Sequence, residues 1–208
     1  MLKIYGRANS INVRKVLWTC DEIGIPFERE DWGRGFRSVN DPEFLAINPF
    51  ALVPAIDDDG FILSESHTIA RYLAARHGRD DLLPTDLRKR ALVESWMDWQ
   101  GTEIAPAAGP AVRAYIFKIQ PAGGQAAIDA SLAEWPKHVA MIEAQLARTR
   151  AYITGPDFTL ADVCIGLTVN RWFMTPTGEK PEFPATAAYY DRLNERPGYK
   201  AHGRNGRP

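Results

Sequence analysis

The sequence lacks several features that would assign it to a specialised class of protein. Its two cysteines cannot form a disulfide framework, so we expect a reducing, cytoplasmic environment. No apolar run approaches the ~18 residues that a membrane-spanning helix needs. The first residues, "MLKIYGRANS", lack the apolar core of a signal peptide. We therefore expect neither a membrane partner nor a targeting segment.

Charge and metal-ligand patterns are also sparse. The formal net charge of -1 gives no electrostatic reason to expect nucleic acid as a partner. The four histidines show no paired ligand spacing, and no phosphate-loop signature is present, so we expect no metal site. The composition, 45% hydrophobic and 25% charged, is typical of a globular protein. The function must therefore come from less obvious motifs.

Residues 1–77 alternate between strand patterns and helix patterns. The segments "LKIY" and "PFERED" predict strands, and the apolar residues from Val13 to Ile23 recur at helical spacing. Apolar runs on both sides of Asp59–Gly60 predict an antiparallel hairpin. The segment "SESHTIARYLAARH" then predicts a helix. The order β-α-β, an irregular segment, and β-β-α predicts an α/β domain over residues 1–77.

The remainder of the chain predicts helices. Residues 78–86 contain glycine, proline and acids without periodicity and predict a linker, and residues 87–208 predict an all-helical domain. The segment "LRKRALVESWMDWQ" opens a long helix, which the prolines of "EIAPAAGP" should bend or break. Three further helices are expected at "QAAIDASLAEWPKHVAMIEAQLARTR", "TLADVCIGLTVNRWF" and "ATAAYYDRLNERPGY".

Three smaller expectations concern the helical part. Thr159 and Asp162 have the spacing of a capping box at the start of a helix. The tail "KAHGRNGRP" has little to bury and should fray. The tryptophans of this part are expected in the core: Trp96, Trp99 and Trp172.

A proline interrupts the run "ALVPAI", which otherwise reads as a buried strand. Proline has no backbone N–H and is normally kept out of central strands. Pro54 therefore lies either in an edge strand or at a position where its presence has a function. The residues around it leave both interpretations open.

The order of elements, the proline inside the third strand and the helical second half resemble the cytosolic glutathione transferases. The resemblance covers nearly the whole chain and rests on "YGRANSINVRKVL", "NPFALVPAI", "ESHTIARYL" and "FTLADVCIG". It is similar to bacterial, serine-type members of theta-, phi- or beta-like character. It implies an N-terminal thioredoxin-like domain (βαβαββα), a C-terminal all-helical domain, and glutathione as cosubstrate.

The resemblance also implies a catalytic role for Ser10. A transferase must lower the pKa of the glutathione thiol, which is about 8.5 when free. Ser10 stands at the start of the first helix, where the helix dipole favours a thiolate. Capping of that helix is the alternative role for Ser10, and Asn12 is a competing donor. Cys20 lies in the apolar stripe of the same helix, and we interpret it as core.

Other positions of the resemblance imply contacts with glutathione. Glu65 can pair with the ammonium group of the γ-glutamyl end, and Ser66, with the helix N–H groups, can bind its carboxylate. A cis bond before Pro54 would free the backbone of Val53 to pair with the cysteinyl part of glutathione. Leu52 stands where several classes of the family carry glutamine.

Further roles are expected at the edges of this site. Arg37, with Arg34 as the alternative, is the candidate for the glycyl carboxylate. The electrophile site is expected between the domains, lined by Arg7, Ala8 and Tyr115. Phe50 either anchors the chain in the partner subunit of a homodimer or packs within its own subunit. His67 is given no role.

The sequence therefore predicts a cytoplasmic glutathione transferase that activates glutathione with Ser10 for attack on a small electrophile. Two alternatives remain open. One is a glutathione-dependent peroxidase or disulfide reductase. The other is a non-catalytic module that has the same fold.

Overall fold

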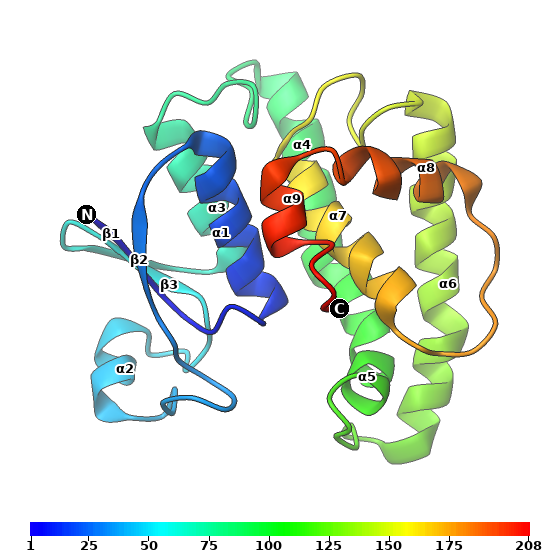
Figure 1. Ribbon diagram of the computed structural model, residues 1–208, viewed down its shortest axis with the longest axis horizontal. Helices are drawn as coiled ribbons and strands as arrows, with labels where there is room; N and C mark the ends of the chain where they lie inside the picture. Colours follow the sequence, from blue (N-terminus) through cyan, green and yellow to red (C-terminus); the bar gives the residue numbers. More distant parts are fainter. The chain divides into compact units, whose positions relative to one another are not determined.

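The computed structural model describes all residues from 1 to 208, and the chain divides into two compact units. The first unit is Met1–Pro84 and the second is Thr85–Pro208. The chain passes from one to the other inside the segment 78–86, where the composition predicted a linker. The first unit contains strands and helices, whereas the second is entirely helical (Figure 1).

A four-stranded mixed sheet forms the centre of the first unit, in the order β2-β1-β3-β4. The strands are β1 (Leu2–Tyr5), β2 (Phe27–Glu30), β3 (Ala55–Asp58) and β4 (Phe61–Ser64). The pair β1–β2 is parallel, and the pairs β1–β3 and β3–β4 are antiparallel. The tight turn between β3 and β4 is made by Asp59 and Gly60, both at positive φ, as the predicted hairpin requires.

Helices cover both faces of this sheet. The helices α1 (Ile11–Ile23) and α3 (Ser66–Arg76) lie side by side on one face, and α2 (Pro42–Ile47) lies on the other (Figure 1). The faces follow from the alternation of side chains along β1. Ile4 packs with residues of α1 and α3, whereas the next residue, Tyr5, packs with Trp32 and with Phe44 of α2. The order βαβαββα is the one that the sequence predicted.

The second unit consists of six α-helices and one π-helical turn. They are α4 (Leu87–Trp99), η1 (Gln100–Ile104), α5 (Ala105–Tyr115), α6 (Gly124–Thr149), α7 (Leu160–Met174), α8 (Pro184–Leu193) and α9 (Pro197–His202). The π-helical turn η1 joins α4 to α5 where the prolines of "EIAPAAGP" were expected to bend or break the helix. The helix α7 is buried along nearly its whole length and forms the core of this unit.

The predicted capping box at the start of α7 is confirmed. The Thr159 side chain accepts a hydrogen bond from the backbone of Asp162, and the Asp162 carboxylate accepts one from the Thr159 backbone N–H. The same carboxylate also accepts from the backbone N–H of Ile153 and from the Tyr189 hydroxyl. Complete burial raises the pKa of Asp162 to about 6, and these hydrogen bonds act in the opposite direction.

Two expectations for the end of the chain are wrong. The single helix expected over "ATAAYYDRLNERPGY" is broken into α8 and α9, because Pro197 lacks the N–H that would continue α8 and instead begins α9. The tail does not fray. Asn170 of α7 donates a hydrogen bond to the carbonyl of Arg207, Arg204 pairs with Asp191, and Gly203 is buried.

The tryptophans are only partly as expected. Trp172 is buried and packs edge-on against Trp135. Trp96 and Trp99 are half-buried, so their assignment to the core is wrong: they pack against each other at the surface of α4, and Trp99 also lies 5.9 Å from the His138 ring. None of the helices combines the length and the apolar character that crossing a membrane requires.

Candidate functional site

A small pocket opens in the first unit where three segments converge. Its volume is about 70 Å³, and seven residues line it: Asn12, Asn48, Leu52, Val53, Pro54, Glu65 and Ser66. They come from the first turn of α1, the segment between α2 and β3, and the start of α3. Six of the seven were predicted from the sequence as site residues. The seventh, Asn48, was not.

The proline segment forms one wall of the pocket. The Val53–Pro54 peptide bond is cis, as expected. The strand β3 begins only at Ala55, so Val53 lies outside the ladder, and its backbone N–H and C=O have no hydrogen-bond partner in the chain. A backbone segment with a free donor and a free acceptor can pair with the backbone of a peptide ligand.

Gly6 allows this segment to approach the start of α1. Its φ of +149° is one that L side chains rarely adopt, and an added Cβ would lie 2.6 Å from Val13 Cγ2 and 3.0 Å from Val53 Cβ. Only glycine fits between α1 and Val53 without displacing one of them. Gly6 could not be singled out from the sequence, because a glycine after a strand also marks an ordinary turn.

Asn48 holds the loop before Val53 from inside. Its side chain is 2% exposed, its Nδ2 donates to the carbonyl of Leu52 at 2.7 Å, and its Oδ1 accepts from the backbone N–H of Phe50 at 3.1 Å. These two hydrogen bonds fix the loop from both ends. The asparagine before a proline was a turn signal that could have identified this residue.

The start of α3 forms the opposite wall. Glu65 caps the helix with φ 70°, a conformation that a residue with a side chain adopts at a cost of about 1–3 kcal/mol. Ser66 is the first residue of α3 and is 6% exposed. The first N–H groups of an α-helix have no partner within the helix, so this wall presents donors and a partial positive charge to the pocket.

Ser10 occupies the N-cap position of α1 but does not cap the helix through its side chain. Its backbone N–H donates to the carbonyl of Arg7, and its backbone C=O accepts from the N–H of Arg14. Its hydroxyl has no hydrogen-bond partner in the chain. The residue is 8% exposed and does not itself line the 70 Å³ pocket, whereas Asn12, two positions further along the chain, does.

Asn12 is held by a lysine that the sequence analysis missed. The Lys15 Nζ lies 3.1 Å from the Asn12 Oδ1 and 2.8 Å from the Nε2 of His67, the second residue of α3. Lys15 is 2% exposed although it is charged. His67, to which no role was given, thus links α3 to α1 directly beside Ser66.

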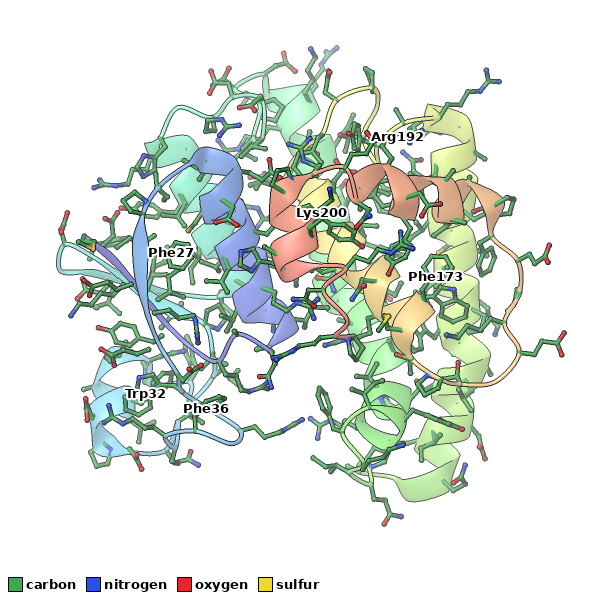
Figure 2. All side chains as sticks on the ribbon, viewed as in Figure 1. Phe27, Trp32, Phe36, Phe173, Arg192 and Lys200 are labelled. Atoms are coloured by element: carbon green, nitrogen blue, oxygen red, sulfur yellow. The ribbon has the colours of Figure 1, made fainter.

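The arginines lie around the irregular segment between β2 and α2. Arg37 pairs with Glu43, and its guanidinium lies 3.8 Å above the ring of Trp32, which Figure 2 labels near α2. Arg34 is exposed. Arg7 is half-buried and donates to Asn9, and burial, together with repulsion from Arg34, lowers its pKa. Neither Arg34 nor Arg37 lines the pocket.

The remaining selected residues lie at different places. Ala8 is half-buried in the segment between β1 and α1. Tyr115 is half-buried at the last position of α5 and belongs to the second unit. Phe50 is 63% exposed and Leu52 is 61% exposed, so the loop between α2 and β3 presents two large apolar side chains to the surface of the first unit.

Cys20 lies where the sequence analysis placed it, in the core. It is fully buried among apolar residues of β1, α1 and α3, and burial raises the pKa of its thiol to about 12. Such a thiol is a poor nucleophile at neutral pH. The structure contains no cluster of three or more His, Cys, Asp or Glu side chains that could hold a metal ion.

The second unit contains a pocket of its own, with a volume of about 150 Å³. It lies between α6, α7 and the segment after α7, and its walls include Trp135, Trp172 and Lys180. None of the residues selected from the sequence for a catalytic or binding role lines it. Of the polar side chains selected for glutathione, those of Asn12, Glu65 and Ser66 line the pocket of the first unit, whereas Ser10 and Arg37 lie outside its lining.

Comparisons with known proteins agree with this geometry. Residues 9–76 match the model of the glutathione S-transferase N-terminal domain, and residues 125–192 match that of the glutathione S-transferase C-terminal domain. The chain is 36% identical over 199 residues to glutathione S-transferase GstB of Escherichia coli K12, covering 95% of each chain. It is 30% identical over 205 residues to glutathione S-transferase 3 of Zea mays, covering 96% of this chain and 91% of the relative.

Solved structures give the same result. The theta class glutathione S-transferase from Xanthomonas axonopodis pv. citri, with glutathione bound, superposes with a TM-score of 0.89 at 34% identity, covering 97% of this chain and 96% of the other. Glutathione transferase F7 from Populus trichocarpa superposes with a TM-score of 0.87 at 27% identity over the full length of both chains. The predicted fold class is thereby confirmed, and the chain belongs to the glutathione S-transferase family.

Proposed function

We propose that this glutathione S-transferase activates the thiol of glutathione with the hydroxyl of Ser10 for attack on a small electrophile. One observation carries the assignment: Ser10 stands at the N-cap of α1 and leaves its hydroxyl without a partner in the chain. A hydroxyl that does not cap its own helix can donate to a thiolate. The partial positive charge of the helix start stabilises the same thiolate and lowers the pKa of the thiol.

Glutathione binds along the pocket of the first unit in this proposal. The free N–H and C=O of Val53 pair with the cysteinyl backbone beside Pro54, and the loop of Leu52 flanks them. Glu65 pairs with the γ-glutamyl ammonium group, and Ser66 binds the γ-glutamyl carboxylate. The related Xanthomonas enzyme, which has a glutathione molecule bound, supports glutathione as the cosubstrate.

The outer parts of the site are proposed from the positions of their residues in the resemblance. Arg37 binds the glycyl carboxylate if it exchanges its partner Glu43 for the ligand. Arg7, Ala8 and Tyr115 line the electrophile site. In this scheme residues 1–77 are the glutathione-binding domain, 78–86 the linker, and 87–208 the helical domain that completes the electrophile site.

We also propose that the protein is a cytoplasmic homodimer in which Phe50 is an interface anchor. The support is the pair of large apolar side chains, Phe50 and Leu52, exposed on one short loop that Asn48 holds in place. Aromatic anchors dominate the binding energy of many interfaces. Sedimentation velocity of the wild type and of Phe50→Ser tests this, and an identical monomeric mass for both would contradict it.

The catalytic assignment is tested with Ser10→Ala and Asn12→Ala. Removal of a hydrogen bond to a developing or resting anion lowers turnover by about 100-fold or more. We expect this loss of kcat in Ser10→Ala, with an aryl halide as the electrophile, together with a raised pKa of the bound thiol. The pKa is measured by titrating thiolate absorbance in the complex.

The controls separate the competing interpretations. Because Ser10 makes no side-chain cap, Ser10→Ala should unfold at the wild-type denaturant concentration. Full activity in Ser10→Ala together with loss in Asn12→Ala would transfer the catalytic role to Asn12. Faster turnover of a hydroperoxide or a mixed disulfide than of any electrophile would favour a reductase. No heat on titration with millimolar glutathione would favour a non-catalytic module.

A further inference from the structure

The buried ammonium of Lys15 determines which way the Asn12 side chain faces. An ammonium group can only donate hydrogen bonds, so the atom of Asn12 that lies 3.1 Å away must be the carbonyl oxygen Oδ1. For the same reason the Nε2 of His67, 2.8 Å away, accepts from Lys15 and carries no proton. The ammonium group thus fixes the amide of Asn12 and the tautomer of His67 together.

This orientation leaves the amide N–H₂ of Asn12 for the pocket. The Nδ2 has no hydrogen-bond partner in the chain, and Asn12 is exposed and lines the pocket with Glu65 and Ser66. The donor is polarised by the positive charge directly behind it. A hydrogen bond from such a group to an anion is stronger than one between neutral groups.

Lys15 also connects the two walls of the pocket. Through Asn12 it contacts the first turn of α1, and through His67 it contacts α3 one residue after Ser66. One part of the pocket is therefore surrounded by hydrogen-bond donors: the Ser66 hydroxyl, the free N–H groups of α3 and the Asn12 N–H₂. The buried ammonium of Lys15 lies behind it. All of these groups favour a negative ligand, whereas Glu65 alone favours a positive one.

We propose that Asn12, oriented by Lys15, binds the γ-glutamyl carboxylate of glutathione together with Ser66. The inference rests on the proposed function and makes it more specific. Lys15 is a positioning residue, since it acts through Asn12 and His67. Asn12 then belongs to the carboxylate end of glutathione, and Ser10 is the donor to the sulfur.

Two peptides distinguish this role from general support of the fold. The first is glutathione, and the second is 4-aminobutyryl-cysteinyl-glycine, which keeps the ammonium group and the thiol but lacks the γ-glutamyl carboxylate. Calorimetric titration should show that Lys15→Met and Asn12→Leu bind glutathione about 10- to 100-fold more weakly than the wild type, the range expected for a hydrogen bond to a charged group. Their affinity for the second peptide should stay within about twofold of the wild type, because the group they serve is missing from it.

The pKa of the bound thiol provides a second readout. In complexes of glutathione with Asn12→Leu it should equal the wild-type value, whereas Ser10→Ala should raise it. Lys3→Met removes an exposed lysine of β1 and is the matched control for loss of one positive charge. It should bind both peptides as the wild type does.

Three results would overturn the inference. An equal loss of affinity for both peptides in Asn12→Leu would mean that Asn12 only supports the fold. A raised thiol pKa in Asn12→Leu would assign it to the sulfur. If the wild type binds neither peptide at millimolar concentration, the proposed function itself fails and the inference fails with it. Asn12→Leu, at an exposed position, keeps the test decisive even if Lys15→Met does not fold.

Discussion

The Asp162 site of the helical unit and the start of α1 in the first unit differ in whether their polar groups have partners. In the helical unit the Asp162 carboxylate is completely buried and accepts hydrogen bonds from Ile153, Thr159 and Tyr189. In the first unit the Ser10 hydroxyl and both backbone groups of Val53 have no partner in the chain. Polar groups in a folded core are normally paired, because an unpaired one is destabilising. The contrast is between a carboxylate whose hydrogen bonds are supplied by its own unit and a pocket region whose hydroxyl and backbone groups have no partner in the chain.

The same contrast holds between two hydroxyl groups in the same local position. Ser10 and Thr159 are both N-cap residues in extended conformation. Thr159 completes a capping box with Asp162, whereas Ser10 makes no cap hydrogen bond. Serine and threonine are both favoured at this position, so local preference does not explain why the Ser10 hydroxyl makes no cap hydrogen bond.

The largest effect is expected from breaking the polar network of the helical unit. Asp162→Ala removes the acceptor for two backbone N–H groups and the Tyr189 hydroxyl, all of which stay buried. We expect the free energy of unfolding to fall by about 3 kcal/mol or more, measured by urea denaturation. Glutathione affinity of the folded variant should not change. Asp129→Ala, at an exposed position of α6, is the control and should unfold as the wild type does.

A smaller loss of stability, together with weaker glutathione binding, is expected from a substitution at the close contact around Gly6 in the first unit. In Gly6→Ala the new Cβ meets Val13 and Val53, so we expect about 2 kcal/mol of destabilisation together with weaker glutathione binding. Gly60→Ala has a similarly unfavourable φ, +93°, but no atom within 4 Å of the added Cβ. Wild-type affinity is therefore expected in Gly60→Ala. If both variants bound glutathione equally well, the contact between Gly6 and Val53 would not shape the site.

The smallest change in stability comes from the matched pair of N-cap hydroxyls. Thr159→Ala should lower the free energy of unfolding by about 1 kcal/mol, as is usual for loss of a cap, and leave turnover intact. Ser10→Ala should leave the free energy of unfolding unchanged and lower turnover. Parallel denaturation curves and turnover assays on the two variants measure both quantities, and a comparable loss of stability in Ser10→Ala would remove the distinction between the two caps.

Several elements could be predicted because their causes are local. The hairpin needs only Asp59–Gly60 between two apolar runs, and the start of α7 needs only Thr159 and Asp162 three residues apart. The break between α8 and α9 was missed, although Pro197 marks it, because the apolar spacing continues across it. The tail is held in place by the hydrogen bond from Asn170 to the carbonyl of Arg207. These residues are 37 positions apart, and no pattern in the sequence connects them.

The site was predictable to the extent that the resemblance supplied it. Glu65, Ser66, Val53 and Pro54 line one pocket as a group. Gly6 and Asn48 were missed because their roles are contacts with segments distant in the chain. Lys15 was missed for the same reason: its partner His67 is 52 positions away, and a lysine beside an apolar stripe ordinarily points to solvent.

The sequence by itself determined the elements, their order, the positions of the caps and turns, and the membership of the family, because each depends on spacing and on residue type within a few positions. Only the tertiary structure decided which groups have partners. It left the Ser10 hydroxyl free while Thr159 is bonded, and it buried the Lys15 side chain of α1 against His67 of α3, beside Asn12. Whether a polar group is satisfied depends on neighbours brought together by folding, and no local pattern records them.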